Sequence, residues 1–176
     1  MQNLLTITEQ DFNKDAVLLD ESEYTLREAS RAVLFDPEGQ VYLMHVTKHG
    51  YHKLPGGGID PGETKEEGLL RELVEEVGCQ AKVNGELGQI TEYRLIFGNQ
   101  KQVSYCYTAQ QVGEQGESAL EEGELAEGMV QVKAKNLAEA IRLLESDRPD
   151  NLEGQFIQKR DVTFLKRAQQ QAYANV

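Results

Sequence analysis

The sequence has little cysteine and no long apolar run, and each shortage argues against a class of protein. Only two cysteines occur among the 176 residues, Cys79 and Cys106, and they lie far apart without the spacing of metal ligands. We therefore expect buried free thiols in a reducing cytoplasm rather than a disulfide framework. No apolar stretch approaches the roughly 18 residues that a membrane-spanning helix needs, so we expect no membrane partner.

Basic residues are also scarce, both at the N-terminus and along the chain. The first twenty residues carry Glu9, Asp11, Asp15 and Asp20 instead of the basic and apolar regions of a signal or transit peptide. Lysine and arginine total 18 against 30 acidic residues, which gives a net charge of −12. A nucleic acid polymer is normally met by a basic patch, because neutralisation of its phosphates supplies most of the non-specific affinity. We therefore expect a cytoplasmic protein without a nucleic acid polymer as partner.

Length and composition predict one domain with a sizeable core, since 39% of the residues are hydrophobic and 27% are charged. Residues 1–25 are expected to form an N-terminal extension with weak helical character around 9–19. Residues 26–176 are expected to form a single domain that ends in a helix. That terminal helix either covers a sheet or joins a homodimer interface, and the sequence leaves both alternatives open.

Strand patterns precede and follow a central helical pattern. Two apolar runs, 31–35 and 41–46, are separated by the turn residues Asp36-Pro37-Glu38-Gly39 and predict a hairpin. Residues 147–150, with Pro149, end one predicted helix before the next begins. The other expected strands are 81–83, 87–95, 103–109 and 129–132, and the expected helices are 137–144 and 155–173.

The central helix is predicted over residues 65–77, directly after a glycine-rich loop. Thr64 followed three residues later by Glu67 forms a capping box at its start, and Gly78 stands where a helix ends. Apolar residues recur at the helical period and are expected to face a core. These residues are Leu70, Leu73, Val74 and Val77.

Three acidic residues of this helix, Glu72, Glu75 and Glu76, share one face because their spacing is i, i+3 and i+4. We expect that face to be solvated and to point away from the apolar stripe. Three carboxylates so close repel one another, and a divalent cation reverses the repulsion. Mg²⁺ prefers carboxylate oxygens and bridges to substrate phosphates, so the cluster suits a magnesium site, with Mn²⁺ as a substitute. Taken alone, the three glutamates fit a solvated helix face of a Glu-rich chain better, and the metal site is favoured only together with the glycine-rich loop, Glu63 and Arg71 at their fixed spacings.

The stretch Gly57 to Cys79 resembles the box of the Nudix hydrolase family, G-x5-E-x7-R-E-U-x-E-E-x-G-U, where U is a bulky apolar residue. Only Cys79, in the last apolar position, departs from the pattern. A chance match anywhere in such a chain would occur with a probability of roughly one in 10⁵. The resemblance covers about residues 27–145. The matching residues are Gly57, Glu63, Arg71, Glu72, Leu73, Glu75, Glu76 and Gly78.

The resemblance implies a fold and a role for each matching residue. The implied fold is an α/β/α sandwich of the α/β class, with a mixed β-sheet and the catalytic helix after the glycine-rich loop. Glu63 and Arg71 are expected to support the loop and helix through an ion pair. The metal is expected to be held by Glu72, Glu75 and Glu76, together with a backbone carbonyl around Gly56 and Gly57.

The resemblance also implies a reaction, the Mg²⁺-dependent attack of water on phosphorus in a nucleoside diphosphate that is linked to another moiety. A helix glutamate or a Glu on a later loop is expected to act as general base. The acidic segment 113–128 offers several candidates, of which Glu124 and Glu127 are favoured because they lie nearest the next strand. The alternative function is a non-catalytic sensor that binds a nucleotide without cleaving it.

The substrate is set outside the box, and the sequence identifies it only as a small nucleotide-type molecule. A nucleoside triphosphate, an oxidised nucleotide and a nucleotide sugar all stay open. Arg31, Tyr51 and His52 are the predicted substrate-binding residues, because a cation meets a phosphate and an aromatic ring stacks on a base. Five further basic residues either line the cleft or belong to the surface, namely His45, Lys48, Arg94, Lys159 and Arg160.

Overall fold

The computed structural model describes residues 1–174. They form a mixed seven-stranded sheet in the order β1-β5-β6-β2-β3-β4, in which β7 also pairs with β3. β2 and β6 run parallel, as do β1 and β5, whereas β5 and β6 are antiparallel. The strands are β1 (Asn3–Thr8), β2 (Thr25–Phe35), β3 (Val41–Val46), β4 (Tyr51–Lys53), β5 (Gln80–Arg94), β6 (Gln100–Val112) and β7 (Met129–Ala134).

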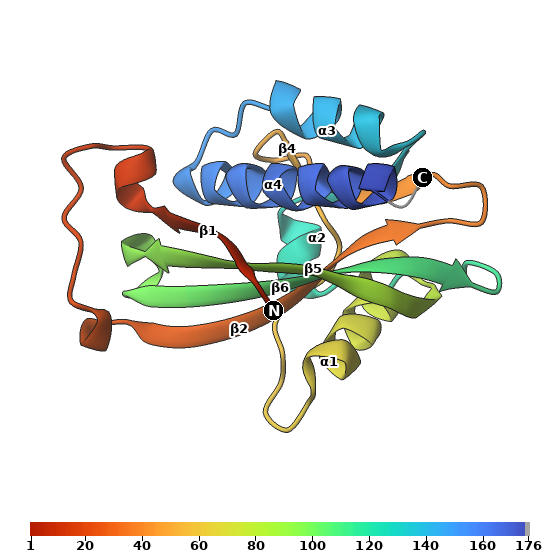
Figure 1. Cartoon of the computed structure of the whole chain (residues 1–176), viewed down its shortest axis with the longest axis horizontal. Coiled ribbons are helices and arrows are strands. Elements are labelled where there is room, and N and C mark those ends of the chain that lie inside the picture. Colours follow the sequence, from red (N-terminus) through yellow and green to blue (C-terminus); the bar gives the residue numbers. More distant parts are fainter. Residues whose placement is uncertain (175–176) are drawn as a thin grey trace.

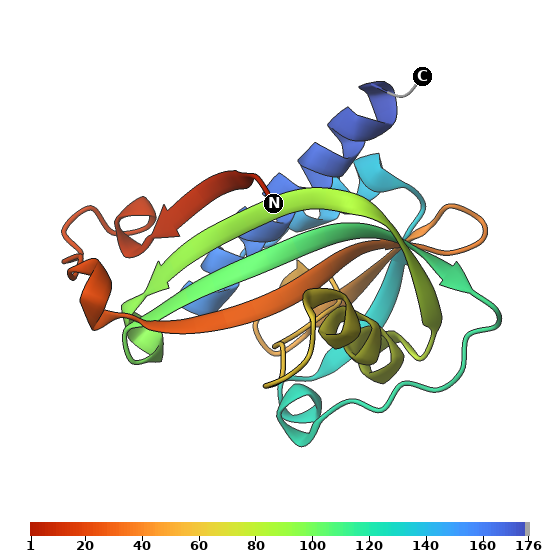
Figure 2. The same ribbon diagram turned by 60° about the horizontal axis from the view of Figure 1, so that its bottom comes forward.

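Helices cover both faces of the sheet, so the predicted α/β/α sandwich is confirmed. Figure 1 shows α3 and α4 on one face and α1 on the other. In Figure 2, α1 and the short helix α2 lie on the same side of the sheet. None of the helices in residues 1–174 is both long and apolar enough to cross a membrane. The helices are α1 (Lys65–Glu72), α2 (Glu122–Ala126), α3 (Leu137–Ser146) and α4 (Leu152–Ala174).

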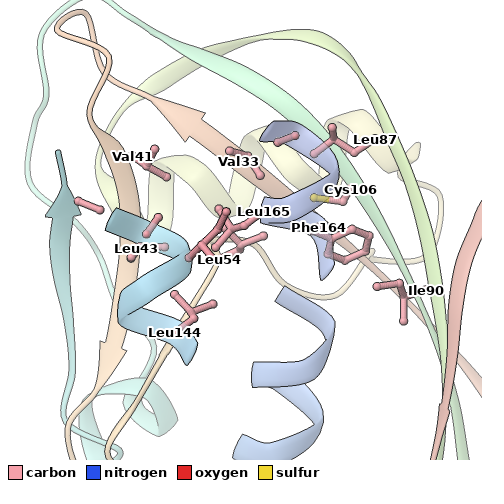
Figure 3. Close-up of a cluster of buried hydrophobic side chains, with 14 of the residues drawn as sticks. Val33, Val41, Leu43, Leu54, Leu87, Ile90, Cys106, Leu144, Phe164 and Leu165 are labelled. Carbon is pink, nitrogen blue, oxygen red and sulfur yellow. The ribbon is translucent and has the colours of Figure 1, made fainter. Parts of the chain in front are cut away.

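The sheet separates two apolar clusters. One lies between the sheet and the α3–α4 pair, where Phe156, Phe164 and Leu165 of α4 are fully buried. Figure 3 shows this cluster, with Phe164 and Leu165 among side chains of the sheet and Leu144 of α3. The other cluster packs α1 against the opposite face. The terminal helix therefore covers the sheet, and these apolar residues are not free for an interface between two copies.

The N-terminal segment contradicts the helix expected around residues 9–19. Residues 3–8 form β1, which pairs in parallel with β5 and buries Ile7 completely. Within residues 9–19 the structure has one helical element, the 3-10 turn Glu9–Asp11. The acidic residues after β1 are compatible with a local helix. The residues before them instead pair with a distant strand, β5. Parallel pairing with a strand some eighty residues away leaves no local pattern in the sequence.

The helix of the box is longer than α1 alone, because a π-helical turn, Leu73–Val77, continues it to Gly78. Gly78 has φ 72°, the left-handed conformation that ends helices. The predicted apolar stripe is partly wrong, since Leu69, Leu73 and Val77 are fully buried whereas Val74 is 39% exposed. The wider π-helical turn changes the spacing of buried residues to four and rotates Val74 outwards.

Candidate active site

The glycine-rich loop lies directly against the helix of the box. A Cβ atom on Gly57 would lie 2.3 Å from Oε1 of Glu72, so only glycine leaves room for that carboxylate. The amide of Gly56 donates to Oε2 of Glu76 at 2.6 Å. The carbonyl of Gly57 accepts from the amide of Ser30 at 2.9 Å, which leaves one lone pair of that oxygen for another ligand.

Arg71 forms the predicted ion pair with Glu63, with 2.9 Å between Nε and Oε1. Its Nη1 atom also lies 3.0 Å from Oε1 of Glu72 and 3.0 Å from Oε2 of Glu75. Its Nη2 atom donates to the carbonyl of Gly58 at 2.9 Å. Hydrogen bonding to Arg71 holds the pKa of Glu63 below its ordinary value. One guanidinium therefore ties the loop to two of the predicted metal ligands.

Glu76 is buried, with 1% of its surface exposed, so the expectation of a solvated acidic face is wrong for this residue. The reason is the rotation of the helix, which turns Glu76 towards β4 and the glycine-rich loop. Nζ of Lys53 donates to its Oε1 at 3.0 Å, and the Gly56 amide occupies the other oxygen. Burial, followed by the charge of Glu76, raises the pKa of the neighbouring Glu72.

The acidic segment before β7 folds into α2 and brings Glu124 towards the box. Burial raises the pKa of Glu124 to about 7, and repulsion from Glu76 acts in the same direction. Glu127 is instead engaged by cations, with 2.9 Å to Nζ of Lys48 and 2.9 Å to Nε2 of His49. Of the two favoured candidates for a general base, Glu124 is the one that lies beside the box glutamates.

The glycine-rich loop, the helix of the box and α2, together with strands of the sheet and α4, line a cavity of about 460 Å³, a volume typical of small-molecule sites. Six glutamates line it, and we call three of them, Glu72, Glu75 and Glu124, the acidic wall; the others are Glu121, Glu127 and Glu153. Glu76 lies behind this wall, bonded to Lys53 and Gly56, which themselves line the cavity.

A family model described as the NUDIX domain matches residues 25–151. The chain belongs to the Nudix family. Among curated relatives, the RNA pyrophosphohydrolase of Wolbachia pipientis subsp. Culex pipiens (strain wPip) is 33% identical over 81 residues, which are 45% of this chain and 49% of the relative. The putative 8-oxo-dGTP diphosphatase of Bacillus subtilis (strain 168) is 49% identical over 52 residues, which are 26% of this chain and 35% of the relative.

These curated relatives are matched over half of their length or less. The fold has solved counterparts as well. The E. coli ORF135 protein superimposes with a TM-score of 0.61 at 16% identity, and the match covers 90% of this chain and 97% of that one. At that identity the likeness establishes a shared fold and nothing more specific.

The Nudix box supplies carboxylate oxygens of the kind that a divalent metal binds, but they are not grouped for one in this structure. Within residues 1–174, no three acidic, histidine or cysteine side chains are already grouped closely enough to hold a metal. Arg71 draws Glu72 and Glu75 to itself, and Lys53 does the same to Glu76. The oxygen donors fit Mg²⁺ in kind. Burial, followed by the charge of Glu76, raises the pKa of Glu72, and a bound cation would offset both effects on the carboxylate.

The three predicted substrate-binding residues have different surroundings in this Nudix chain. Arg31 and Tyr51 both line the cavity and are both buried. His52 does not line it, and this prediction is corrected. Its Nδ1 lies 3.0 Å from Oδ1 of Asp147, and its ring stacks on His45 with 4.3 Å between centroids. His52 alternates with Tyr51 along β4, so its side chain points to the other face of the strand.

The sequence did not identify two of the basic residues that line the cavity, and it left the location of two others undecided. Arg27 of β2 and Lys53 of β4 line it but carry no motif. Arg94 of β5 and Arg160 of α4, which the sequence left between cleft and surface, also line the cavity and are 4% and 1% exposed. We call Arg27, Arg31, Arg94 and Arg160 the arginine floor. These four are half of the eight arginines in the sequence, and no motif singles them out. Only the fold brings them together.

Proposed function

We propose that this chain is a Mg²⁺-dependent pyrophosphohydrolase that cleaves a nucleoside diphosphate linked to another moiety by attack of water on phosphorus. Membership of the Nudix family supports the reaction class. The observation that carries the proposal for this chain is the convergence of the acidic wall on one cavity of about 460 Å³, with the buried Glu76 directly behind it.

In this proposal Glu72, Glu75 and Glu76 hold the metal, with the carbonyl around Gly56 and Gly57 as a further ligand. When bound, the metal supplies positive charge that stabilises the phosphoryl oxygens and the leaving phosphate. Ion pairing with Arg71 holds the carboxylates of Glu72 and Glu75 at the cavity before the metal binds.

Glu124 is the proposed general base, because it lines the cavity beside the proposed metal ligands. Its carboxylate takes the proton from the attacking water. A pKa of about 7 suits this role, since a base near the operating pH combines availability with proton affinity. Glu127 is a poorer candidate because Lys48 and His49 hold its carboxylate.

The proposed substrate is a small nucleotide and not an RNA end. Because some relatives are named RNA pyrophosphohydrolase, an RNA end is a competing candidate substrate. Their match is confined to a part of this chain. The net charge of −12 favours a small nucleotide that arrives with its metal over a polyanion. We also propose that the enzyme works in a reducing cytoplasm, which suits its two buried free thiols.

The test is the release of phosphate-containing products from nucleoside triphosphates, 8-oxo-dGTP, nucleotide sugars and 5′-triphosphorylated RNA, each with Mg²⁺, Mn²⁺ or EDTA. Metal-dependent cleavage of one small nucleotide well above the others supports the proposal. Faster cleavage of the RNA overturns the choice of substrate. No turnover, together with a rise in melting temperature on adding a nucleotide, favours the sensor instead.

A further inference from the structure

The cavity is lined by a second group of charged side chains besides the acidic wall, the arginine floor. Its four guanidinium groups come from three separate elements, β2, β5 and α4. Arginine is planar, stays charged and presents a fork of donors, which makes it the usual partner of phosphate groups in proteins. Four of them in one cavity of an acidic chain require a physical explanation.

Two of these arginines have carboxylate partners. Nε of Arg160 lies 2.7 Å from Oδ1 of Asp161, and its Nη1 lies 3.5 Å from Oε2 of Glu92. Nη2 of Arg94 lies 2.6 Å from Oε1 of Glu92. Both carboxylates are completely buried, so they neutralise this inner half of the arginine floor and serve the fold.

The other two arginines lack such partners. Nε and Nη1 of Arg31 are buried without any hydrogen bond, although only 6% of this residue is exposed. Arg27 donates from Nη1 to the neutral Oε1 of Gln102 at 2.6 Å. Burial lowers the pKa of both side chains, that of Arg31 to about 10. A buried charge whose donors lack hydrogen bonds is unfavourable, so the donors of Arg31 indicate an anionic ligand. Arg27 is half-buried near Arg31 and has only a neutral hydrogen-bond partner.

The position of Arg31 indicates which part of a substrate that anion belongs to. Arg31 lies near both Glu76 of the box and Arg160, since the charges of these two residues act on it and it lines the same cavity. An anion bound there would adjoin the phosphates that the metal ligands hold. The apolar residues of the cavity, among them Met129 and Ile157, are left for a nucleoside base.

We propose that Arg27 and Arg31 bind a phosphate group of the substrate that the metal ligands do not hold. The substrate is then a nucleoside triphosphate type, with a charged terminal phosphate, and not a nucleotide sugar, whose sugar is neutral. This inference rests on the proposed pyrophosphohydrolase function and narrows its substrate class.

The experiment compares substrates that share a nucleoside and differ in the terminal group, UTP with UDP-glucose and GTP with GDP-mannose. The wild-type enzyme should prefer the triphosphate in kcat/KM. Arg27→Gln and Arg31→Met should each raise the KM for the triphosphate by about 10-fold or more and change the KM for the nucleotide sugar little. Arg142→Gln is the control, because Arg142 lies on α3 with its side chain 74% exposed, and it should change neither.

Thermal unfolding in EDTA with inorganic phosphate provides a readout without turnover. Phosphate should raise the melting temperature of the wild-type protein and not that of Arg31→Met. Arg31→Met without phosphate should melt no lower than the wild type, because it removes a buried charge that has no hydrogen-bond partner at Nε or Nη1. A melting temperature several degrees lower would mean that the guanidinium serves the fold, and would overturn the inference.

The inference and the proposed function fail in different ways. If both substrates of a pair are cleaved equally and the arginine variants slow both alike, the inference is wrong while the hydrolase stands. The opposite result has two parts: the wild-type protein cleaves no substrate but is stabilised by phosphate, and Arg31→Met is not stabilised. In that case the anion site stands and the hydrolase proposal fails.

Discussion

The acidic wall and the arginine floor face the same cavity but are assembled differently. Two members of the wall, Glu72 and Glu75, lie on one helix, and their cation Arg71 lies on the same helix. The arginine floor is gathered from residues 27 to 160, and its carboxylate partners Glu92 and Asp161 serve only half of it.

This difference separates two tasks. Glu72, Glu75 and Glu76 are held by cations that the proposed metal would replace, so substitutions at these residues should lower kcat and metal affinity. The arginine floor has guanidinium donors left over for a ligand, so substitutions there should act on KM and phosphate binding. The following predictions test the wall side of this comparison, from the largest expected effect to the smallest.

Glu75→Gln should lower kcat by about 10²-fold or more, because even residues that only support a metal ligand typically cost 10- to 100-fold. The side chain is 35% exposed, so the melting temperature should stay near that of the wild type. Steady-state kinetics and calorimetric titration with Mn²⁺ provide the measurements, and EDTA should remove the activity of both proteins. Near-normal turnover and metal affinity in this variant would contradict the proposed metal site.

Glu124→Gln should lower kcat by about 10²-fold and leave Mn²⁺ affinity unchanged, as expected for a general base that is not a ligand. The matched control is Glu122→Gln on the same short helix, because Glu122 is exposed and does not line the cavity. Equal effects of the two substitutions would show that α2 contributes only its negative charge.

Gly57→Ala should lower kcat by about 10-fold or more, since the new methyl group would displace the carboxylate of Glu72 from its place against the loop. Gly116→Ala is the control, because its nearest neighbour would be a carbonyl oxygen at 3.5 Å, an ordinary contact. Kinetics of both variants are compared, and an unaffected Gly57→Ala enzyme would mean that Glu72 moves freely.

Thr64→Ala should destabilise the protein by about 0.5–2 kcal/mol, because Oγ1 of Thr64 accepts from the amide of Glu67 at 3.2 Å at the start of α1. Urea unfolding gives the free energy, and Thr64→Ser should restore most of it because serine caps equally well. A loss that serine does not restore would assign the effect to packing instead of capping.

Glu63→Gln should remove a part of the acid sensitivity of folding. Hydrogen bonding to Arg71 lowers the pKa of Glu63 in the folded protein below its ordinary value of 4.5. The carboxylate therefore stabilises the fold above that value, and this contribution is lost as the pH falls through the lowered folded pKa. Unfolding free energies of the two proteins should differ most at neutral pH and converge in acid. A difference that is independent of pH would contradict the ion pair's role.

Local patterns predicted local structure well. The capping box at Thr64, the stop at Gly78 and the hairpin around Asp36 all occur where the sequence indicates them. The errors arose where long-range packing overrides a local pattern. Residues 3–8 became a strand beside β5, and the rotation of the box helix buried Glu76 and exposed Val74.

The sequence by itself determined the family, the helix that carries the carboxylates and the pairing of Glu63 with Arg71, because all of these depend on spacings within 23 residues. Only the tertiary structure decided that Glu124 and not Glu127 lies beside the box, that His52 points away, and that four arginines meet in one cavity. The physical reason is distance along the chain. Helix periodicity and capping act over a few residues, whereas a cavity collects side chains from strands and helices that only the packed sheet brings together.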